Sequence, residues 1–196
     1  MPDTVLTLDA LNILFQTLTM QMLGLSMVPG LALDASAYKV RLSWPTKGAP
    51  AWKVEEDVVF LRCFEIDDPY NRQREDIDSA VDLENYNQAT GYTSVNSIFW
   101  TFYGPNSYAN AQAIRDKMFH QEHHDTLARS NIFLLPDVKA PQRMPEKFEE
   151  QWWERVDLVM HFNELVVREI TGKTLASAEV QIHGESGSPL ITIIEE

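Results

Sequence analysis

Apolar residues recur every three or four positions near the start of the chain, which predicts an amphipathic helix over residues 3–24. The expected apolar face consists of Leu8, Leu11, Phe15, Leu18 and Met22. The polar residues between them, including Gln16 and Thr19, are expected on the solvent side. Gly24 and the following Pro29-Gly30 pair mark the end of this helix.

Farther along, apolar and polar residues alternate, which predicts strands. Residues 38–44 place Tyr38, Val40, Leu42 and Trp44 on one face. Residues 57–66 are apolar on both faces, as expected for a strand in the middle of a sheet. Further strands are predicted at 95–103, 132–136, 156–163, 179–183 and 190–194. The alternation slips near Glu164, which predicts a bulge or a break there.

A second helix is predicted after the turn Gly104-Pro105-Asn106-Ser107, with Asn106 or Ser107 as its N-cap. It runs to about His123, and its inner edge is formed by Ala111, Ile114 and Met118. Strands grouped in runs, with few helices, favour an α+β fold. We therefore expect a mostly antiparallel sheet with helices packed on one face.

Residues 67–93 lack a clear period and are strongly acidic, so we expect a long, mobile acidic arm that orders on assembly. Residues 1–184 are then a single domain with this arm as an insertion. Residues 185–196 form a C-terminal extension, in which a glycine- and serine-containing linker leads into a short β-prone end.

The net charge, the cysteine count and the absence of long apolar runs limit the classes of function that the chain can have. The net charge of -13 disfavours tight binding to nucleic acid. The charge either keeps the chain from aggregating or lines a surface past which DNA slides. Cys63 is the only cysteine, so no disulfide can form within the chain, and it is expected to be a small core residue. We expect no secretory signal, because no basic region precedes the first apolar residues, and no membrane span, which needs roughly 20 apolar residues.

Candidate catalytic chemistry is sparse. His120 and His124 are four residues apart, so on a helix they share a face and are a candidate metal pair for a hydrolase. The zinc-hydrolase pattern needs Glu directly after the first His, and this chain has Gln121. The alternative is that these histidines interact with the dipole and free carbonyls of a helix end. We expect no catalytic residues, no metal and no cofactor, and therefore not an enzyme.

Trp152-Trp153-Glu154-Arg155 is the densest unusual segment. In an extended chain neighbouring side chains point to opposite faces, so one Trp can lie in the core and the other outside. An outward Trp suggests an interface, although a Trp that covers the sheet edge within its own chain is equally consistent. Glu154 and Arg155 are candidates for ion pairs with neighbouring subunits.

The β-prone end at residues 190–194 is a second candidate contact. It can add to a sheet edge of a neighbour or pair within its own chain, and the sequence leaves both open. The predicted interface residues from the two segments are Trp152, Trp153, Arg155, Leu190, Ile191 and Ile193.

Four segments together resemble the phage neck terminator, or tail terminator, family of tailed bacteriophages. They are Glu56-Asp57-Val58-Val59-Phe60-Leu61, Asp68-Pro69-Tyr70, Trp100 to Ser107 with the helix that follows, and Trp152 to Leu158 followed by Phe162-Asn163-Glu164. The resemblance covers roughly residues 55–170. The tyrosine–glycine turn before a helix, followed by the double tryptophan, is the most specific combination.

The resemblance implies a small tail-terminator-like fold that assembles into a ring, commonly of six subunits, at the head-proximal end of the tail. Such a ring ends the tail tube and joins it to the neck, and it has no catalytic residues. The implied partners are other copies of the chain, the tail tube protein and a neck or head–tail connector protein, with the tail sheath as a further candidate. Genomic DNA passes through without specific binding. We expect assembly in the cytoplasm of the bacterial host and a place in the virion. Another head–tail adaptor or tail completion protein is the alternative.

Overall fold

The computed structural model describes residues 5–26, 38–43, 52–80, 85–148, 150–173, 178–183 and 189–195. Contacts divide the chain into two units. The larger unit, called the body here, comprises Thr4–Gln73 and Tyr92–Val166. The smaller unit comprises Met1–Asp3, Arg74–Gly91 and Val167–Glu196. No helix in the described ranges is long and apolar enough to cross a membrane.

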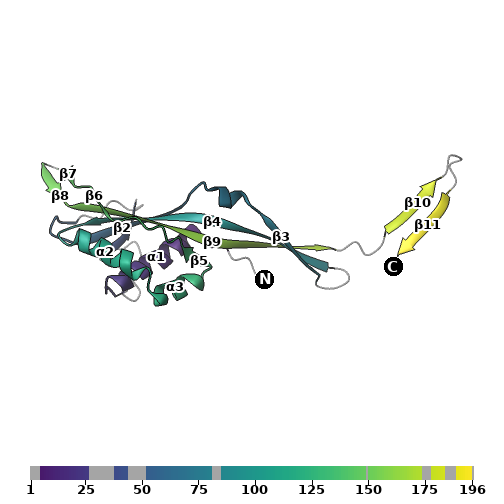
Figure 1. Ribbon diagram of the computed structural model, residues 1–196, viewed down its shortest axis with the longest axis horizontal. Coiled ribbons are helices and arrows are strands. Elements are labelled where there is room, and N and C mark those ends of the chain that lie inside the picture. The colour runs from purple at the N-terminus through teal and green to yellow at the C-terminus, as the bar shows by residue number, and fades with distance from the viewer. Residues whose placement is uncertain are drawn as a thin grey trace. The chain divides into compact units, whose positions relative to one another are not determined.

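A mixed sheet forms the framework, with strand order β1-β2-β4-β9-β5 (Figure 1). Its strands are β1 (Val40–Leu42), β2 (Val58–Glu65), β4 (Asn85–Tyr103), β9 (Arg155–Lys173) and β5 (Ile132–Leu134). The short β6 (Gln142–Arg143) pairs with β9. β2 pairs antiparallel with β4, as β5 does with β9, whereas β1 runs parallel to β2. The expectation of an α+β fold with a mostly antiparallel sheet is confirmed.

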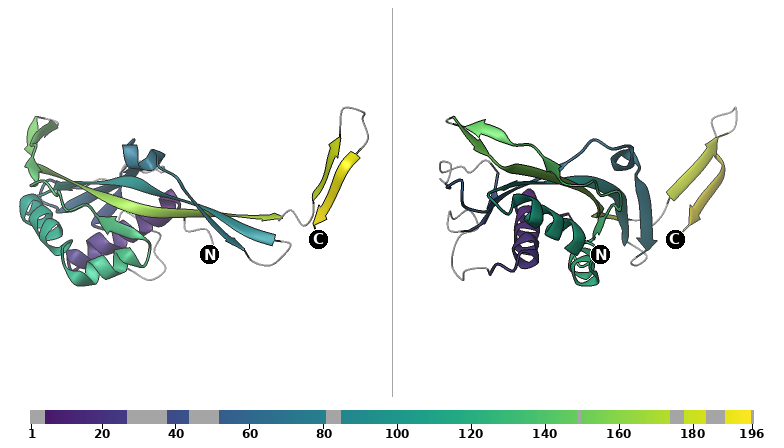
Figure 2. Two further views of the ribbon diagram at one scale, coloured as in Figure 1. Left: turned by 45° about the vertical axis from the view of Figure 1, so that its right-hand side comes forward. Right: turned by 60° about the vertical axis from the view of Figure 1, so that its left-hand side comes forward.

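Three helices cover one face of this sheet: α1 (Leu8–Met22), α2 (Ser107–Lys117) and α3 (Gln121–Ala128) (Figures 1 and 2). The expected single helix up to His123 is wrong, because the chain leaves α2 after Lys117 and His120 becomes the N-cap of α3. The predicted inner edge of α2 is confirmed, since its three members are fully buried: Ala111, Ile114 and Met118.

The buried face of α1 is more polar than its sequence suggests. Leu11, Phe15, Leu18 and Met22 are buried as predicted, but Leu8 in the first turn is 56% exposed. Gln16 and Thr19, expected in solvent, are fully buried.

Each of these two buried polar groups has a partner in the sheet. The Gln16 side-chain amide donates to the carbonyl of Val40 (2.9 Å), and the Trp100 indole donates to the Thr19 hydroxyl (2.9 Å). Burying a polar group is tolerated when it is hydrogen-bonded, so these side chains fix α1 to β1 and β4.

The predicted bulge or break near Glu164 is also wrong, because β9 continues through it and its buried positions keep their alternation. Phe162 and Val166 on either side are buried, so Glu164 occupies the inward position between them. Its carboxylate accepts from the Leu6 backbone N–H (3.1 Å) and from the Asn96 side-chain amide (2.9 Å). A polar residue, Glu164, occupies an inward position where the alternation predicts an apolar one. In the sequence this looks the same as a shift in the alternation of the strand.

A close approach of two chain segments precedes α2. Gly104 has φ +101, and a Cβ there would lie 2.5 Å from the carbonyl oxygen of Glu56. Asp57 also accepts from the backbone N–H and the side-chain amide of Asn106 (2.9 and 2.8 Å). Only glycine fits this contact without strain. The geometry therefore links two of the family-like segments, 56–61 and 100–107.

Residues 67–93, predicted as an acidic arm without a clear period, have regular secondary structure in their described parts. They contain the 3₁₀ helix η1 (Pro69–Arg72), the strand β3 (Glu75–Ala80) and the start of β4. β3 pairs antiparallel with β4, from Glu75 opposite Gly91 to Ala80 opposite Tyr86. A ladder of backbone hydrogen bonds needs no hydrophobic period, which explains why the sequence pattern missed it.

The smaller unit also contains a two-stranded ribbon, β10 (Ala178–His183) and β11 (Pro189–Glu195). Their antiparallel register places Val180 opposite Ile193 and Ile182 opposite Ile191. The predicted strands at 179–183 and 190–194 are confirmed, and β11 pairs within its own chain. Trp44 and residues 184–188 of the predicted linker at 184–189 lie outside the described residues.

Candidate assembly surface

A short hairpin carries the double tryptophan. Its strands are β7 (Glu146–Phe148) and β8 (Gln151–Trp153), with Lys147 opposite Trp152 and Glu146 opposite Trp153. Successive side chains of a strand point to opposite faces, so the two tryptophans face in opposite directions. Trp152 is 66% exposed, whereas Trp153 is partly buried. The predicted outward Trp is therefore Trp152, whereas Trp153 is only partly buried and is not one of the buried core residues.

Trp153 packs within its own chain, in a cluster of aromatic rings. Its ring centroid lies 5.9 Å from that of Trp52, 6.4 Å from Tyr103 and 6.2 Å from Phe148, each in an edge-to-face geometry. Trp52 in turn contacts Phe60 of β2 at 4.9 Å. Edge-to-face pairs at these distances are favourable, so Trp153 attaches the hairpin to the sheet.

Arg155, at the start of β9, makes the polar attachment. It donates to both carboxylate oxygens of Asp157 (2.9 and 2.8 Å) and to Glu146 of β7 (3.0 Å). The Tyr103 hydroxyl donates to the other oxygen of Glu146 (2.8 Å). The hydrogen bonds to Asp157, and then the one to Glu146, raise the pKa of the Arg155 guanidinium above its ordinary value. Burial and the bond to Glu146 raise the pKa of Tyr103.

Both charges that we considered for contacts between subunits therefore have partners within the chain. Arg155 holds Glu146 and Asp157, and Glu154 accepts two hydrogen bonds from Arg143, each of 3.0 Å. In this arrangement Trp153 and Arg155 position the hairpin, and Trp152 is the tryptophan that the hairpin presents to solvent.

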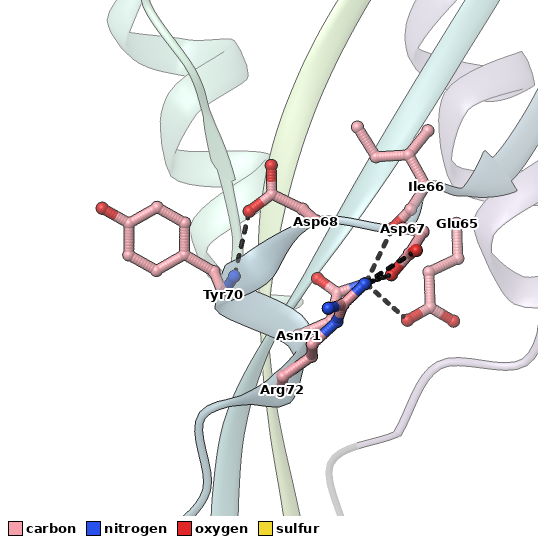
Figure 3. Close-up of polar contacts among 7 residues, drawn as sticks. All are labelled: Glu65, Ile66, Asp67, Asp68, Tyr70, Asn71 and Arg72. Carbon is pink, nitrogen blue, oxygen red and sulfur yellow. Dashed lines mark hydrogen bonds and ion pairs between the residues drawn. The ribbon is translucent and has the colours of Figure 1, made fainter.

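The family-like segment Asp68-Pro69-Tyr70 forms a second exposed aromatic site, for which the sequence alone predicted no role. The Asp68 carboxylate accepts from the Tyr70 backbone N–H (3.0 Å) and caps η1 (Figure 3). Pro69 occupies the first turn of η1, where its fixed φ is favourable. The Tyr70 ring is 66% exposed and points away from the polar contacts of the turn.

Asn71 connects this turn to the sheet. Its side-chain amide donates to the carbonyl of Ile66 (2.7 Å) and to Glu65 (3.0 Å), and its side-chain oxygen accepts from the Val95 N–H of β4 (2.9 Å). Figure 3 also shows the two hydrogen bonds from Arg72 to Asp67. The backbone at Tyr70 is thus held by hydrogen bonds of the side chains that precede it and follow it in the chain.

The histidine cluster lies at the start of a helix, where the dipole does not favour positive charge. His120 is the N-cap of α3 and is exposed, as is His124. His123, between them, is buried at 6% exposure, and this burial lowers its pKa. Among the residues that the structure describes, no group of three His, Cys, Asp or Glu side chains could hold a metal ion.

Cys63 in β2 is buried, as predicted. Burial raises the pKa of its thiol to about 12. At neutral pH the reactive thiolate is therefore scarce.

The other predicted contact residues lie in β11. Ile191 and Ile193 are opposite Ile182 and Val180 of β10, and Leu190 lies beside the register shift at Ile182/His183. Their part in assembly stays a prediction.

Comparison with known families adds one finding. A family model described as phage neck terminator protein matches residues 9–187. The match extends from α1 through β10, well beyond the 55–170 region that carries the resemblance in sequence, and it ends before β11. No curated protein sequence matches the chain.

The substitution Arg155→Met is expected to lower the free energy of unfolding by about 2 kcal/mol, because it leaves the Asp157 carboxylate, only 8% exposed, without its cation. Arg143→Met is the matched control. Its pair with Glu154 is half exposed or more on both sides, so the loss should stay below about 1 kcal/mol. Urea unfolding at pH 7 measures both, and equal losses would contradict the positioning role of Arg155.

His123 makes stability depend on pH. Unfolded His takes up a proton below its ordinary pKa of 6.5, while buried His123 resists it, so the unfolded state binds more protons and stability falls as pH falls through this window. His123→Gln should flatten the stability profile between pH 7 and pH 5, and exposed His124→Gln should not. Chemical unfolding at each pH measures the slope, and an unchanged slope in His123→Gln rules this out.

Proposed function

Since this chain belongs to the phage neck terminator family, we propose that it assembles into a closed ring, commonly of six subunits, at the head-proximal end of a phage tail. It is a structural protein of the phage tail and neck. In the proposed role the ring ends the tail tube and joins it to the neck.

The observation that carries the proposal is that Trp152 is exposed on a hairpin whose position is fixed by contacts within the chain. Trp153 and Arg155 attach this hairpin to the body, so little conformational entropy is lost when Trp152 binds a partner. Covering the exposed part of a Trp side chain contributes on the order of 3 kcal/mol. Trp152 is therefore our candidate for the central contact residue between subunits.

A closed ring uses head-to-tail contacts, so each subunit needs more than one kind of contact surface. The β10–β11 ribbon supplies a further candidate, with Leu190, Ile191 and Ile193 as its contact residues. An isolated two-stranded ribbon is marginally stable in water. The register places Val180, Ile182, Ile191 and Ile193 at positions of one face, which a neighbouring subunit can cover.

The acidic balance supports the same role. A net charge of -13 on each subunit repels phosphate, so a ring of such subunits lets DNA pass without holding it. The proposed partners are the tail tube protein and a neck or head–tail connector protein, with the sheath as a further candidate in tails that have one. Assembly is proposed to occur in the cytoplasm of the bacterial host.

A phage with a stop codon in this gene is expected to give filled heads and unjoined tails in a non-suppressing host, because the tube lacks its end piece. Electron microscopy of the particles measures this, and the intact gene supplied in trans should restore joining. In parallel, mass photometry of the purified 22.5-kDa chain with tail tube protein should give a ring at a whole multiple of that mass. Normal joined particles without the gene product would refute the proposed role.

Removal of residues 185–196 is expected to leave the melting temperature of the monomer nearly unchanged and to weaken ring formation. The reason is that the described ladder of β11 is with β10 alone. Ile193→Glu tests the same point with the chain at full length, and Thr192→Glu, at the neighbouring position opposite Gln181, is its matched control. A large loss of melting temperature in a confirmed monomer would show that this end stabilises the fold instead.

A further inference from the structure

A groove lies beside the hairpin, between the start of α2 and β6. It has a volume of about 660 Å³ and is lined by Pro105, Ser107, Tyr108, Pro141, Arg143 and Glu154. Tyr108 is 41% exposed, so its ring borders the opening. The volume exceeds that of an indole, and nothing within the described part of the chain fills it.

The lining has two kinds of surface. Two proline rings and the Tyr108 ring supply apolar faces, and an aromatic ring packs well on such faces. The Glu154 side chain is 50% exposed and carries a negative charge beside Arg143. A carboxylate has about four acceptor positions, so its bonds to Arg143 leave room for a second cation.

The outward face of the β7–β8 hairpin has the complementary pair. Lys147 lies directly opposite Trp152 in the register, and directly opposite residues of an antiparallel pair share a face. Both residues are exposed. The hairpin therefore presents an indole and an ammonium group side by side.

We infer that the groove of one subunit receives Trp152 of a second copy of this chain, with Lys147 placed against Glu154. This inference rests on the proposed function and names the two surfaces that meet in the ring. Trp152 is 66% exposed, so it is not seated in the groove of its own chain. The occupant is a second copy because this one chain supplies both halves of the match: an aromatic ring for the Pro–Tyr surface, and a cation for the carboxylate.

A pair of variants tests the inference by mixing. Trp152→Ala keeps an intact groove, and Tyr108→Ala keeps an intact hairpin, so each alone is expected to lose ring formation, with subunit affinity weakened at least about thirtyfold. A one-to-one mixture should restore one contact and give dimers that cannot close, because the second contact in each dimer lacks both partners. Size-exclusion chromatography with multi-angle light scattering distinguishes monomers, dimers and rings.

Tyr70→Ala is the matched control, because Tyr70 is as exposed as Trp152 and lies elsewhere on the body. It should form rings like the unmodified chain. Unchanged melting temperatures for all three variants show that the fold is intact, as expected for exposed positions.

Disulfide trapping gives a second reading. One copy carries Trp152→Cys and the other carries Tyr108→Cys, and the two copies are made with different masses. On mild oxidation they should form a mixed disulfide, which is recognised by its mass. Cys63 is buried and should not react.

Rings that form normally from Trp152→Ala or Tyr108→Ala, or a missing mixed disulfide, overturn the inference. If the unmodified chain and both variants form rings equally well, the proposed function stands and only the contact between Trp152 and the groove is wrong. If the unmodified chain forms no ring with tube protein, the proposed function fails, and the inference fails with it.

Discussion

The hydrogen-bonded ion pairs of Arg155 are the interaction on which the exposed β7–β8 hairpin depends. Arg155 is the first residue of β9 and bonds a carboxylate of its own strand and one of the β7–β8 hairpin. The aromatic contact of Trp153 with Trp52 and Tyr103 adds an apolar attachment at the same place. A hairpin of three-residue strands would be unstable alone. Fixed at both points, it becomes a rigid support for one solvent-facing tryptophan.

Polar contacts also fix the positions of elements in the core, because apolar packing alone is not directional and would let the elements slide. Glu164 joins β9 to β4 and to the segment before α1, and Thr19 receives the indole N–H of Trp100. A buried polar group is unfavourable in every arrangement except the one that satisfies it. These contacts therefore determine which way α1 lies on the sheet, while the burial of residues such as Phe15 and Phe162 supplies the stability.

The sequence predicted what depends on local pattern and missed what depends on pairing. The strands at 57–66 and 95–103, the inner edge of α2 and the opposite directions of Trp152 and Trp153 all followed from periodicity. The β3–β4 pairing did not, because its polar residues have no hydrophobic period. The partners of Arg155, Glu164 and Thr19 were equally hidden, since each bonds to a residue distant in sequence or on another element. The groove beside Tyr108 is also formed by segments far apart in the chain.

The burial of Cys63 matters for a protein that, in its proposed role, passes from a reducing to an oxidising environment. In that proposed role the subunit is made in reducing cytoplasm, and the finished particle meets dissolved oxygen. Many copies of one chain packed in a ring would be linked at random if each carried a reactive thiol. A sulfur enclosed in β2, with its pKa raised to about 12, stays in the thiol form and out of reach. Contacts between subunits then stay free of covalent crosslinks, so the assembly tolerates oxidants without being fused by them.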